Sequence, residues 1–120
     1  IEEDTAEENH RRSMDNLRRL EHAAQRTDIG PLNIVKVPYP RRVMMQGDVL
    51  PASYTNFFIG NNIAIVPTFN DPKDRQVLGI LAELMPNHHV VGIHAVDLVL
   101  GLGSFHCLTQ QEPCSRRELS

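Results

Sequence analysis

The chain has 120 residues, of which 41% are hydrophobic and 22% charged, and 12 basic against 15 acidic side chains leave a formal charge of −3. This length supports one soluble domain at most, or a piece of a larger one. The acidic balance argues against a nucleic-acid-binding protein, which needs a basic surface. The acidic first residues and the lack of a long apolar run argue against a signal peptide or a membrane span, and two cysteines are too few for a disulfide scaffold.

Residues 1–28 are polar and densely charged but carry a helical pattern. Thr5 and Glu8 fit a capping box, in which each side chain accepts a hydrogen bond from a backbone N–H of the first turn. Apolar residues then recur at spacings of three and four, at Met14, Leu17, Leu20 and Ala24. The Gly-Pro pair at 30–31 predicts the end of the helix, and its charged residues are interpreted as a solvated face.

The middle of the chain predicts short strands. Residues 32–37 are typical of a buried strand, and the proline-rich residues 38–52 predict a loop. Aromatic and β-branched residues at 53–59 predict a second strand. The turn signal Gly-Asn-Asn at 60–62 and the apolar residues 63–66 then predict a hairpin.

A second helix is predicted to have Asp71 as its N-cap and Pro72 at its first helical position, and to end at Pro86. Its buried face is predicted to consist of Val77, Leu78, Leu81, Leu84 and Met85. Residues 90–93 predict another strand, and residues 104–109 a last one.

Residues 53–94 therefore predict a strand-strand-helix-strand module. Residues 5–37 are interpreted as the second half of an identical module. The element order indicates a modular α/β protein, of which this chain is about one and a half modules.

Reactive residues are densest at 101–111, which read Gly-Leu-Gly-Ser-Phe-His-Cys-Leu-Thr-Gln-Gln. Cys107 follows a Gly-x-Gly bend, where backbone can approach a ligand closely. It is a candidate nucleophile, although a lone cysteine is more often a small buried apolar residue. His106 is an unlikely base for it if the segment is a strand, because strand neighbours point to opposite faces.

A metal site is a third interpretation of the same region. Imidazole and thiol donors occur at His88, His89, His94, His106, Cys107 and Cys114. No ligand pair of the usual zinc spacing is present, so the pattern gives this interpretation little support. The chain also lacks a glycine-rich phosphate loop between a strand and a helix.

Two segments carry a family resemblance: Pro-Ala-Ser-Tyr-Thr-Asn-Phe-Phe-Ile at 51–59, and Gly-Leu-Gly-Ser-Phe-His-Cys-Leu-Thr-Gln-Gln-Glu-Pro at 101–113. With Ile65-Val66-Pro67 and Asp71-Pro72 between them, they resemble the C-terminal part of agmatine deiminases and of the bacterial, Porphyromonas-type peptidylarginine deiminases. The resemblance is strong over 51–113 and weak before it. It implies a five-bladed α/β propeller of the pentein type, with modules at 5–37 and 53–94 and a nucleophile strand at 101–111.

The resemblance also implies roles for single residues. Cys107 matches the family nucleophile, which forms a covalent amidino-thioether with a guanidinium carbon. Asn56 matches an asparagine beside that cysteine, or is a strand residue that satisfies a nearby backbone group. Gly101 and Gly103 match glycines of the substrate pocket, whereas Leu102 stands where the family usually has a third glycine.

The family's general acid/base histidine and its substrate-binding carboxylates are expected upstream of Ile1, and none of the six histidines here occupies that motif. The 120 residues alone are therefore expected to be inactive. The implied function is hydrolysis of agmatine to N-carbamoylputrescine in polyamine biosynthesis. Two alternatives stay open: a peptidylarginine deiminase and a non-catalytic truncated remnant.

The expected partner is a small-molecule guanidine substrate such as agmatine, or peptidylarginine. Neither a cofactor nor a metal is expected, and no nucleic acid or membrane partner. A homodimer is an open option for the full-length protein. The expected location is the cytoplasm, with secretion not excluded.

Overall fold

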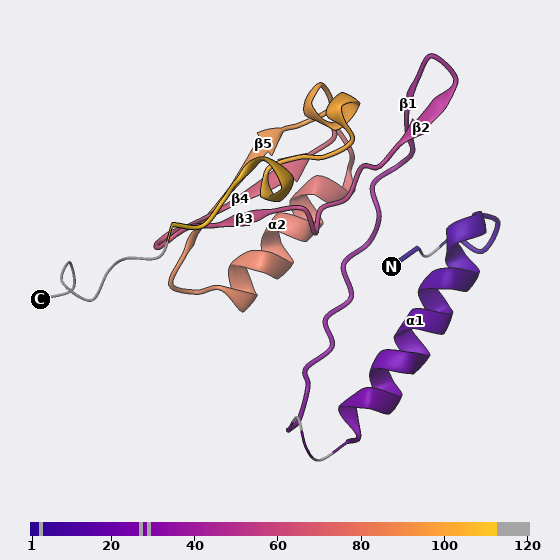
Figure 1. Cartoon of the computed structure of the whole chain (residues 1–120), viewed down its shortest axis with the longest axis vertical. Coiled ribbons are helices and arrows are strands. Elements are labelled where there is room, and N and C mark those ends of the chain that lie inside the picture. The colour runs from indigo at the N-terminus through magenta and orange to yellow at the C-terminus, as the bar shows by residue number, and fades with distance from the viewer. Residues whose placement is uncertain (3, 27, 29, 113–120) are drawn as a thin grey trace, which may run out of the picture.

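A computed structural model describes residues 1–112 except 3, 27 and 29. The chain has an α/β fold with two parts (Figure 1). One is an arm made of helix α1 (Glu8–Ala24) and the extended segment after it, and the other is a small sheet packed on helix α2 (Lys73–Leu84). The radius of gyration is 16.6 Å, against about 14 Å for a compact domain of this length. The arm therefore stands apart from the sheet.

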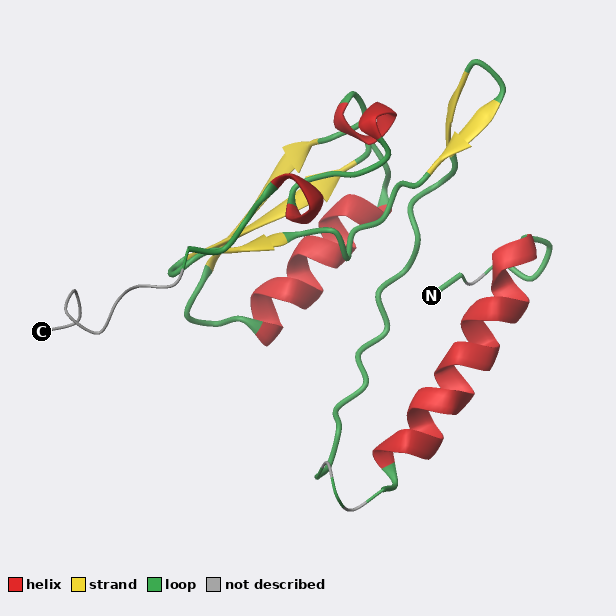
Figure 2. Ribbon diagram, viewed as in Figure 1, coloured by secondary structure: helices red, strands yellow, loops and turns green. Residues whose placement is uncertain are grey.

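The sheet confirms the predicted strand-strand-helix-strand order (Figure 2). Strands β3 (Phe58–Ile59) and β4 (Ile63–Thr68) form the predicted antiparallel hairpin, and β5 (His89–His94) pairs with β4 in parallel after the α2 crossover. Gly60 N–H donates to the Ile63 carbonyl across the turn, at 2.8 Å. Pro67 lies on β4 beyond its pairing with β3, so its missing N–H costs no hydrogen bond on that side.

The hydrophobic core lies between α2 and the sheet. Its buried members are Tyr54, Val66, Phe69, Val77, Leu81, Ala95 and Val99. Of the residues predicted for the buried face of α2, Val77 and Leu81 are buried and Leu78 and Met85 pack against the core, whereas Leu84 is exposed. The helical periodicity thus identified the right face of the helix, apart from its last turn.

Helix α1 forms as predicted, but its first turn does not. The capping box of Thr5 and Glu8 is wrong: the helix begins at Glu8 without a side-chain cap, and Asp4 Oδ1 instead accepts from Ala6 N–H at 2.9 Å. The helix ends at Ala24, several residues before the Gly-Pro pair. Of its apolar stripe only Leu17 is buried, and Leu20 is exposed. Across the described residues, no helix is long and apolar enough to cross a membrane.

The predicted strand at 32–37 is wrong. The segment is extended but belongs to no sheet, and Leu32 and Val35 are exposed. A strand needs a neighbour for its backbone groups, and no described segment supplies one here. The predicted loop at 38–52 instead contains a hairpin of β1 (Val43–Met45) and β2 (Asp48–Leu50).

The hairpin turns at Gln46-Gly47, where both residues have positive φ, 50° and 91°. Two positive φ angles in a two-residue loop are typical of the type I′ turn. Asn-Gly or Asp-Gly is the usual sequence signal of this turn. Because the sequence here is Gln-Gly, the hairpin was not predicted.

The strand predicted at 53–59 is confirmed only at Phe58–Ile59. The residues before it form a turn closed by Asn56 N–H, which donates to the Ser53 carbonyl at 3.3 Å. Ser53 Oγ also accepts from Thr55 N–H at 3.3 Å and is 2.8 Å from Thr55 Oγ1. These local side-chain bonds compete with a strand, and they place Asn56 at the end of a turn.

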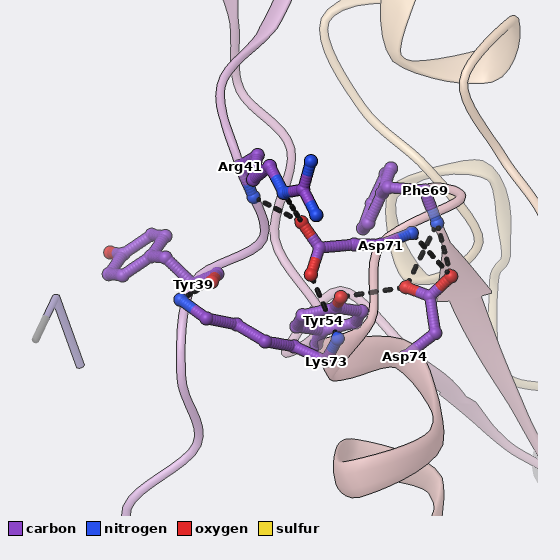
Figure 3. Close-up of polar contacts among 7 residues, drawn as sticks. All are labelled: Tyr39, Arg41, Tyr54, Phe69, Asp71, Lys73 and Asp74. Atoms are coloured by element: carbon purple, nitrogen blue, oxygen red, sulfur yellow. Dashed lines mark hydrogen bonds and ion pairs between the residues drawn. The ribbon is translucent and has the colours of Figure 1, made fainter.

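Two carboxylates at the start of α2 hold several segments together (Figure 3). Asp71 Oδ1 accepts from Lys73 N–H at 2.8 Å, although the residue directly before the helix is Pro72 and not the predicted N-cap Asp71. Asp71 Oδ2 accepts from Arg41 N–H at 2.8 Å and lies 3.6 Å from Arg41 Nε. Lys73 Nζ donates to the Tyr39 carbonyl at 3.0 Å. The base of the β1–β2 hairpin is thereby joined to the first turn of α2.

Burial alone would raise the pKa of Asp71, but the N–H donors of Arg41 and Lys73 and the two cations lower it overall. A carboxyl whose pKa is lower in the folded chain stabilises the fold above its unfolded pKa, near 3.9. That stability is lost as the pH falls through the lower, folded value.

We therefore predict that Asp71→Asn lowers the free energy of unfolding at pH 7 by about 1–3 kcal/mol, because the Asn amide would oppose Arg41 N–H with a donor. The deficit should shrink as the pH falls below about 4, since the wild-type chain then loses the same contribution. Urea denaturation of the native-length protein, meaning this chain with whatever sequence adjoins it, at pH 7 and pH 3.5 measures both effects. The control Asp48→Asn changes an exposed carboxylate on β2; an equal loss in that variant would contradict the prediction.

Candidate active site

The candidate nucleophile lies on a short 3₁₀ helix, not on a strand. The strand predicted at 104–109 is wrong: residues His106–Leu108 form the single turn η2. Leu108 N–H donates to the Ser104 carbonyl at 3.2 Å. The segment curls because its amide groups bond to Asn56 and to one another instead of a neighbouring strand. Strand alternation therefore cannot decide which way His106 points relative to Cys107.

Asn56 and Cys107 are joined by a pair of hydrogen bonds. Asn56 Nδ2 donates to Cys107 Sγ at 3.1 Å, and Cys107 N–H donates to Asn56 Oδ1 at 3.2 Å. A side-chain amide carries one donor group and one acceptor, which here match the sulfur and the backbone N–H of one residue. The structure thus brings together the two residues predicted to act as a pair, although 51 positions separate them.

The backbone of Asn56 is bonded to the same segment. Its carbonyl accepts from Ser104 Oγ at 3.2 Å and from His106 N–H at 3.3 Å. Ser104 is buried, whereas Cys107 and His106 are exposed. The thiol is therefore accessible to solvent, while the hydrogen bond between Asn56 and the buried Ser104 fixes the segment that carries it. Sequence reasoning missed Ser104; its only signal was a small polar residue between a glycine and an aromatic.

The two candidate pocket glycines differ in their surroundings. A Cβ at Gly103 would lie 2.9 Å from Cys107 Cβ and 3.3 Å from Sγ, which is too close. A Cβ at Gly101 would have no atom within 4 Å. Gly103 is therefore a site of close approach to Cys107, and Gly101, at the end of η1 (Leu98–Gly101), lines open space.

Leu102 adopts the backbone conformation that glycine favours. Its φ is +64° and its ψ is +20°, and the residue is 75% exposed to solvent. A left-handed conformation costs an L-residue about 1–2 kcal/mol. The side chain is exposed to solvent and makes little packing contact within the described chain. The cost of having leucine where the family usually has glycine is therefore the strain of the left-handed backbone.

The other metal-ligand candidates do not assemble. Among residues 1–112 without 3, 27 and 29, no three His, Cys, Asp or Glu side chains come together as a metal site would require. Asn56 is the one described residue hydrogen-bonded to the Cys107 sulfur. Cys114 lies outside the described residues.

Comparison with known proteins places this chain in a family. The model of the Porphyromonas-type peptidyl-arginine deiminases matches residues 1–113. The chain belongs to this family. The agmatine deiminase of Pseudomonas fluorescens is 48% identical over 68 residues, which are 57% of this chain and 18% of that enzyme. The chain thus corresponds to a minor part of its relative.

Solved structures show the same fold. The agmatine deiminase of Enterococcus faecalis superposes with a TM-score of 0.82 at 29% identity, over 92% of this chain and 35% of that one. A cysteine-to-serine agmatine deiminase of C. jejuni with substrate bound gives a TM-score of 0.80 at 26% identity, over 88% of this chain and 30% of that one. The predicted α/β fold and the family resemblance are confirmed.

The contrast between the two glycines gives a test of the site. We predict that Gly103→Ala displaces Cys107 and speeds hydrogen exchange at the amides of His106 and Cys107 by about five- to a hundredfold, the equivalent of the roughly 1–3 kcal/mol that overpacking costs. Gly101→Ala, whose Cβ meets nothing, should leave that exchange within about twofold. Mass-spectrometric hydrogen exchange on the native-length protein measures both. Equal exchange in the two variants would show that no close approach exists at Gly103.

The conformation of Leu102 gives a second test. Leu102→Gly should raise the free energy of unfolding by up to about 1 kcal/mol, because relief of the left-handed strain exceeds the added chain entropy of glycine. Leu102→Ala removes the same exposed side chain but keeps the strain, so it should leave stability within about 0.5 kcal/mol. Urea denaturation of both variants separates the effect of the strained backbone on stability from the effect of the side chain. If Ala and Gly prove equally stable, the strain is absent.

Proposed function

We propose that the native-length protein, meaning this chain with whatever sequence adjoins it, hydrolyses a guanidine C–N bond and releases ammonia. Agmatine is the proposed substrate and N-carbamoylputrescine the product. The observation that carries the proposal is the Asn56–Cys107 pair, an exposed thiol held by an amide in a member of this family. The relatives named agmatine deiminase support the choice of substrate.

Cys107 is the proposed nucleophile. Its thiolate attacks the guanidinium carbon, forming a C–S bond and a tetrahedral adduct. One nitrogen takes up a proton and leaves as ammonia as its C–N bond breaks, which leaves a cationic amidino-thioether. Water then attacks the same carbon and gives up two protons, and the C–S bond breaks to return the thiolate. The sum is guanidinium plus water giving a ureido product, ammonia and one proton.

Asn56 suits this chemistry because it is neutral. Its Nδ2 group donates to the sulfur at 3.1 Å, and a thiolate is a better acceptor than a thiol. A charged partner would alter the net charge beside a cationic substrate, whereas an amide holds the sulfur without doing so. The backbone N–H of Cys107, bound to Asn56 Oδ1, keeps the amide in the orientation that presents its donor to the sulfur.

The remaining chemistry needs groups beyond this chain. A planar guanidinium is recognised by facing carboxylates, and the proton transfers need an acid/base group. We infer that the adjoining sequence supplies both, because the chain spans 18% of its P. fluorescens relative and 35% of the E. faecalis structure. The proposed whole is a five-bladed propeller in which residues 53–94 form one module and 5–37 the end of another.

A peptidylarginine deiminase is the second candidate. The family model that matches the chain carries that description. The C. jejuni structure, a cysteine-to-serine agmatine deiminase that holds its substrate, favours agmatine and a thiol as the reacting group. Assaying agmatine and a peptidylarginine in parallel decides between the two substrates, and activity with neither would favour the truncated remnant.

We predict that Cys107→Ser lowers ammonia release by at least about a thousandfold in the native-length protein without unfolding it, because a hydroxyl is far less nucleophilic than a thiol at neutral pH. Cys114→Ser is the matched control and should leave the rate within a few-fold. Coupled ammonia detection with both substrates, and a thermal melt of each variant, measure this. Comparable losses in the two variants would overturn the assignment of Cys107.

A further inference from the structure

A buried tyrosine lies two residues before Asn56. The ring of Tyr54 is 1% exposed and packs edge-on against Phe69, with centroids 5.4 Å apart. Its hydroxyl donates to Asp74 Oδ1 at 2.7 Å (Figure 3). Burial, followed by the hydrogen bond and charge of Asp74, raises the pKa of Tyr54, so the phenol keeps the proton that it donates.

Asp74 is itself held in place. It lies in the first turn of α2, and its carboxylate accepts from Phe69 N–H at 3.1 and 3.2 Å and from Asp71 N–H at 3.1 Å (Figure 3). The acceptor for Tyr54 is therefore fixed by the loop between β4 and α2. A hydrogen bond to a charged, partly buried acceptor is among the stronger ones in a protein.

The turn at 53–56 connects Tyr54 to the candidate site. Asn56 N–H closes this turn on the Ser53 carbonyl, with Tyr54 inside it. Asn56 then makes four hydrogen bonds to the segment of Cys107: its Nδ2 group donates one, its Oδ1 accepts one, and its carbonyl accepts two. A displacement of Tyr54 is thus passed to Asn56 over two peptide units, and Asn56 is the hydrogen-bond partner of the sulfur.

We propose that Tyr54 is a positioning residue for Cys107: its hydroxyl, bound to Asp74, fixes the turn that aims Asn56 at the sulfur. Tyr54 touches neither the sulfur nor a substrate, so it acts through Asn56 alone. This inference rests on the proposed role of Cys107 in catalysis. It adds a route by which the start of α2 governs the reactivity of a thiol on a different segment.

Tyr54→Phe is the variant of choice, because it removes the hydroxyl and keeps the ring against Phe69. Asn56→Ala and the double variant complete a thermodynamic cycle. If Tyr54 acts through Asn56, its substitution must lose its effect once the Asn56 side chain is gone. A merely structural role would give the same fold-change in both backgrounds.

In the native-length protein, Tyr54→Phe is expected to lower kcat for agmatine about tenfold with KM within twofold, because misplacing a reacting group affects the transition state more than binding. Rates are expressed per Cys107 that a haloacetamidine labels in a parallel sample, so unfolded protein is not counted; this reagent is a cationic guanidinium mimic with a group that reacts with thiols. In the Asn56→Ala background the same substitution should change kcat less than twofold.

The rate of Cys107 alkylation by iodoacetamide gives a second reading that needs no substrate. In the wild-type background, Tyr54→Phe is expected to slow this alkylation at least about threefold. In the Asn56→Ala background, the same substitution should change the alkylation rate by less than about 1.5-fold. Should the protein hydrolyse neither agmatine nor peptidylarginine, the proposed function fails, and the alkylation cycle alone decides the role of Tyr54. Asn56→Leu, which keeps the volume of the side chain but has neither donor nor acceptor, replaces Asn56→Ala if the latter does not fold.

Leu81→Val is the control for stability. Leu81 is a buried core residue two turns along α2 from Asp74, and its truncation should cost about 1 kcal/mol. It should leave alkylation within about 1.5-fold in either background. The proposal is overturned if Tyr54→Phe leaves the alkylation rate unchanged, if its effect persists without the Asn56 side chain, or if Leu81→Val reproduces it.

Discussion

The site depends on one residue that joins two distant segments. Asn56 makes four hydrogen bonds to residues 104–107, and the remainder of the candidate site follows from them. They satisfy the amides that would otherwise need a neighbouring strand, so η2 can form where sheet was expected. They also leave the Cys107 thiol exposed and oriented. The close packing of Gly103 on Cys107 is the steric counterpart of the same arrangement.

The start of α2 supports this arrangement from the other side of the turn. The Asp74 carboxylate accepts hydrogen bonds from the Tyr54 hydroxyl and from two backbone N–H groups. The Asp71 carboxylate accepts one from Arg41 N–H, at the base of the β1–β2 hairpin. A carboxylate withdrawn from water is costly unless charges or hydrogen bonds compensate it. The buried Asp71 has its N–H donors and the Arg41 cation, and the half-buried Asp74 accepts from Tyr54, Phe69 and Asp71. One helix turn therefore links the arm, the core and the turn that presents Asn56. Under the proposed role of Tyr54, stability and reactivity depend on the same contacts, so a variant here needs a control that separates the two.

Much of this could be predicted where a pattern is local. The periodicity of α1 and α2, the hairpin turn at 60–62 and the strand at 90–93 follow from local spacing, and the motifs around Asn56 and Cys107 indicated the family. The two wrongly predicted strands share a physical cause. Residues 32–37 and 104–109 have strand-like composition, yet the described chain offers them no partner strand, and propensity cannot report a missing neighbour. The four bonds of Asn56 and the buried Ser104 depend on contacts across about 50 residues, which no local pattern encodes.

The most direct test of the account is covalent labelling of the native-length protein with a haloacetamidine, which mimics a guanidinium and carries a group reactive toward thiols. Its cationic head should be drawn to the substrate site, which holds the thiolate close to the reactive carbon. The account predicts one label per chain, mapped to Cys107 by peptide mass analysis and slowed by added agmatine. A label found chiefly on Cys114, or labelling of Cys107 that agmatine does not slow, would contradict it.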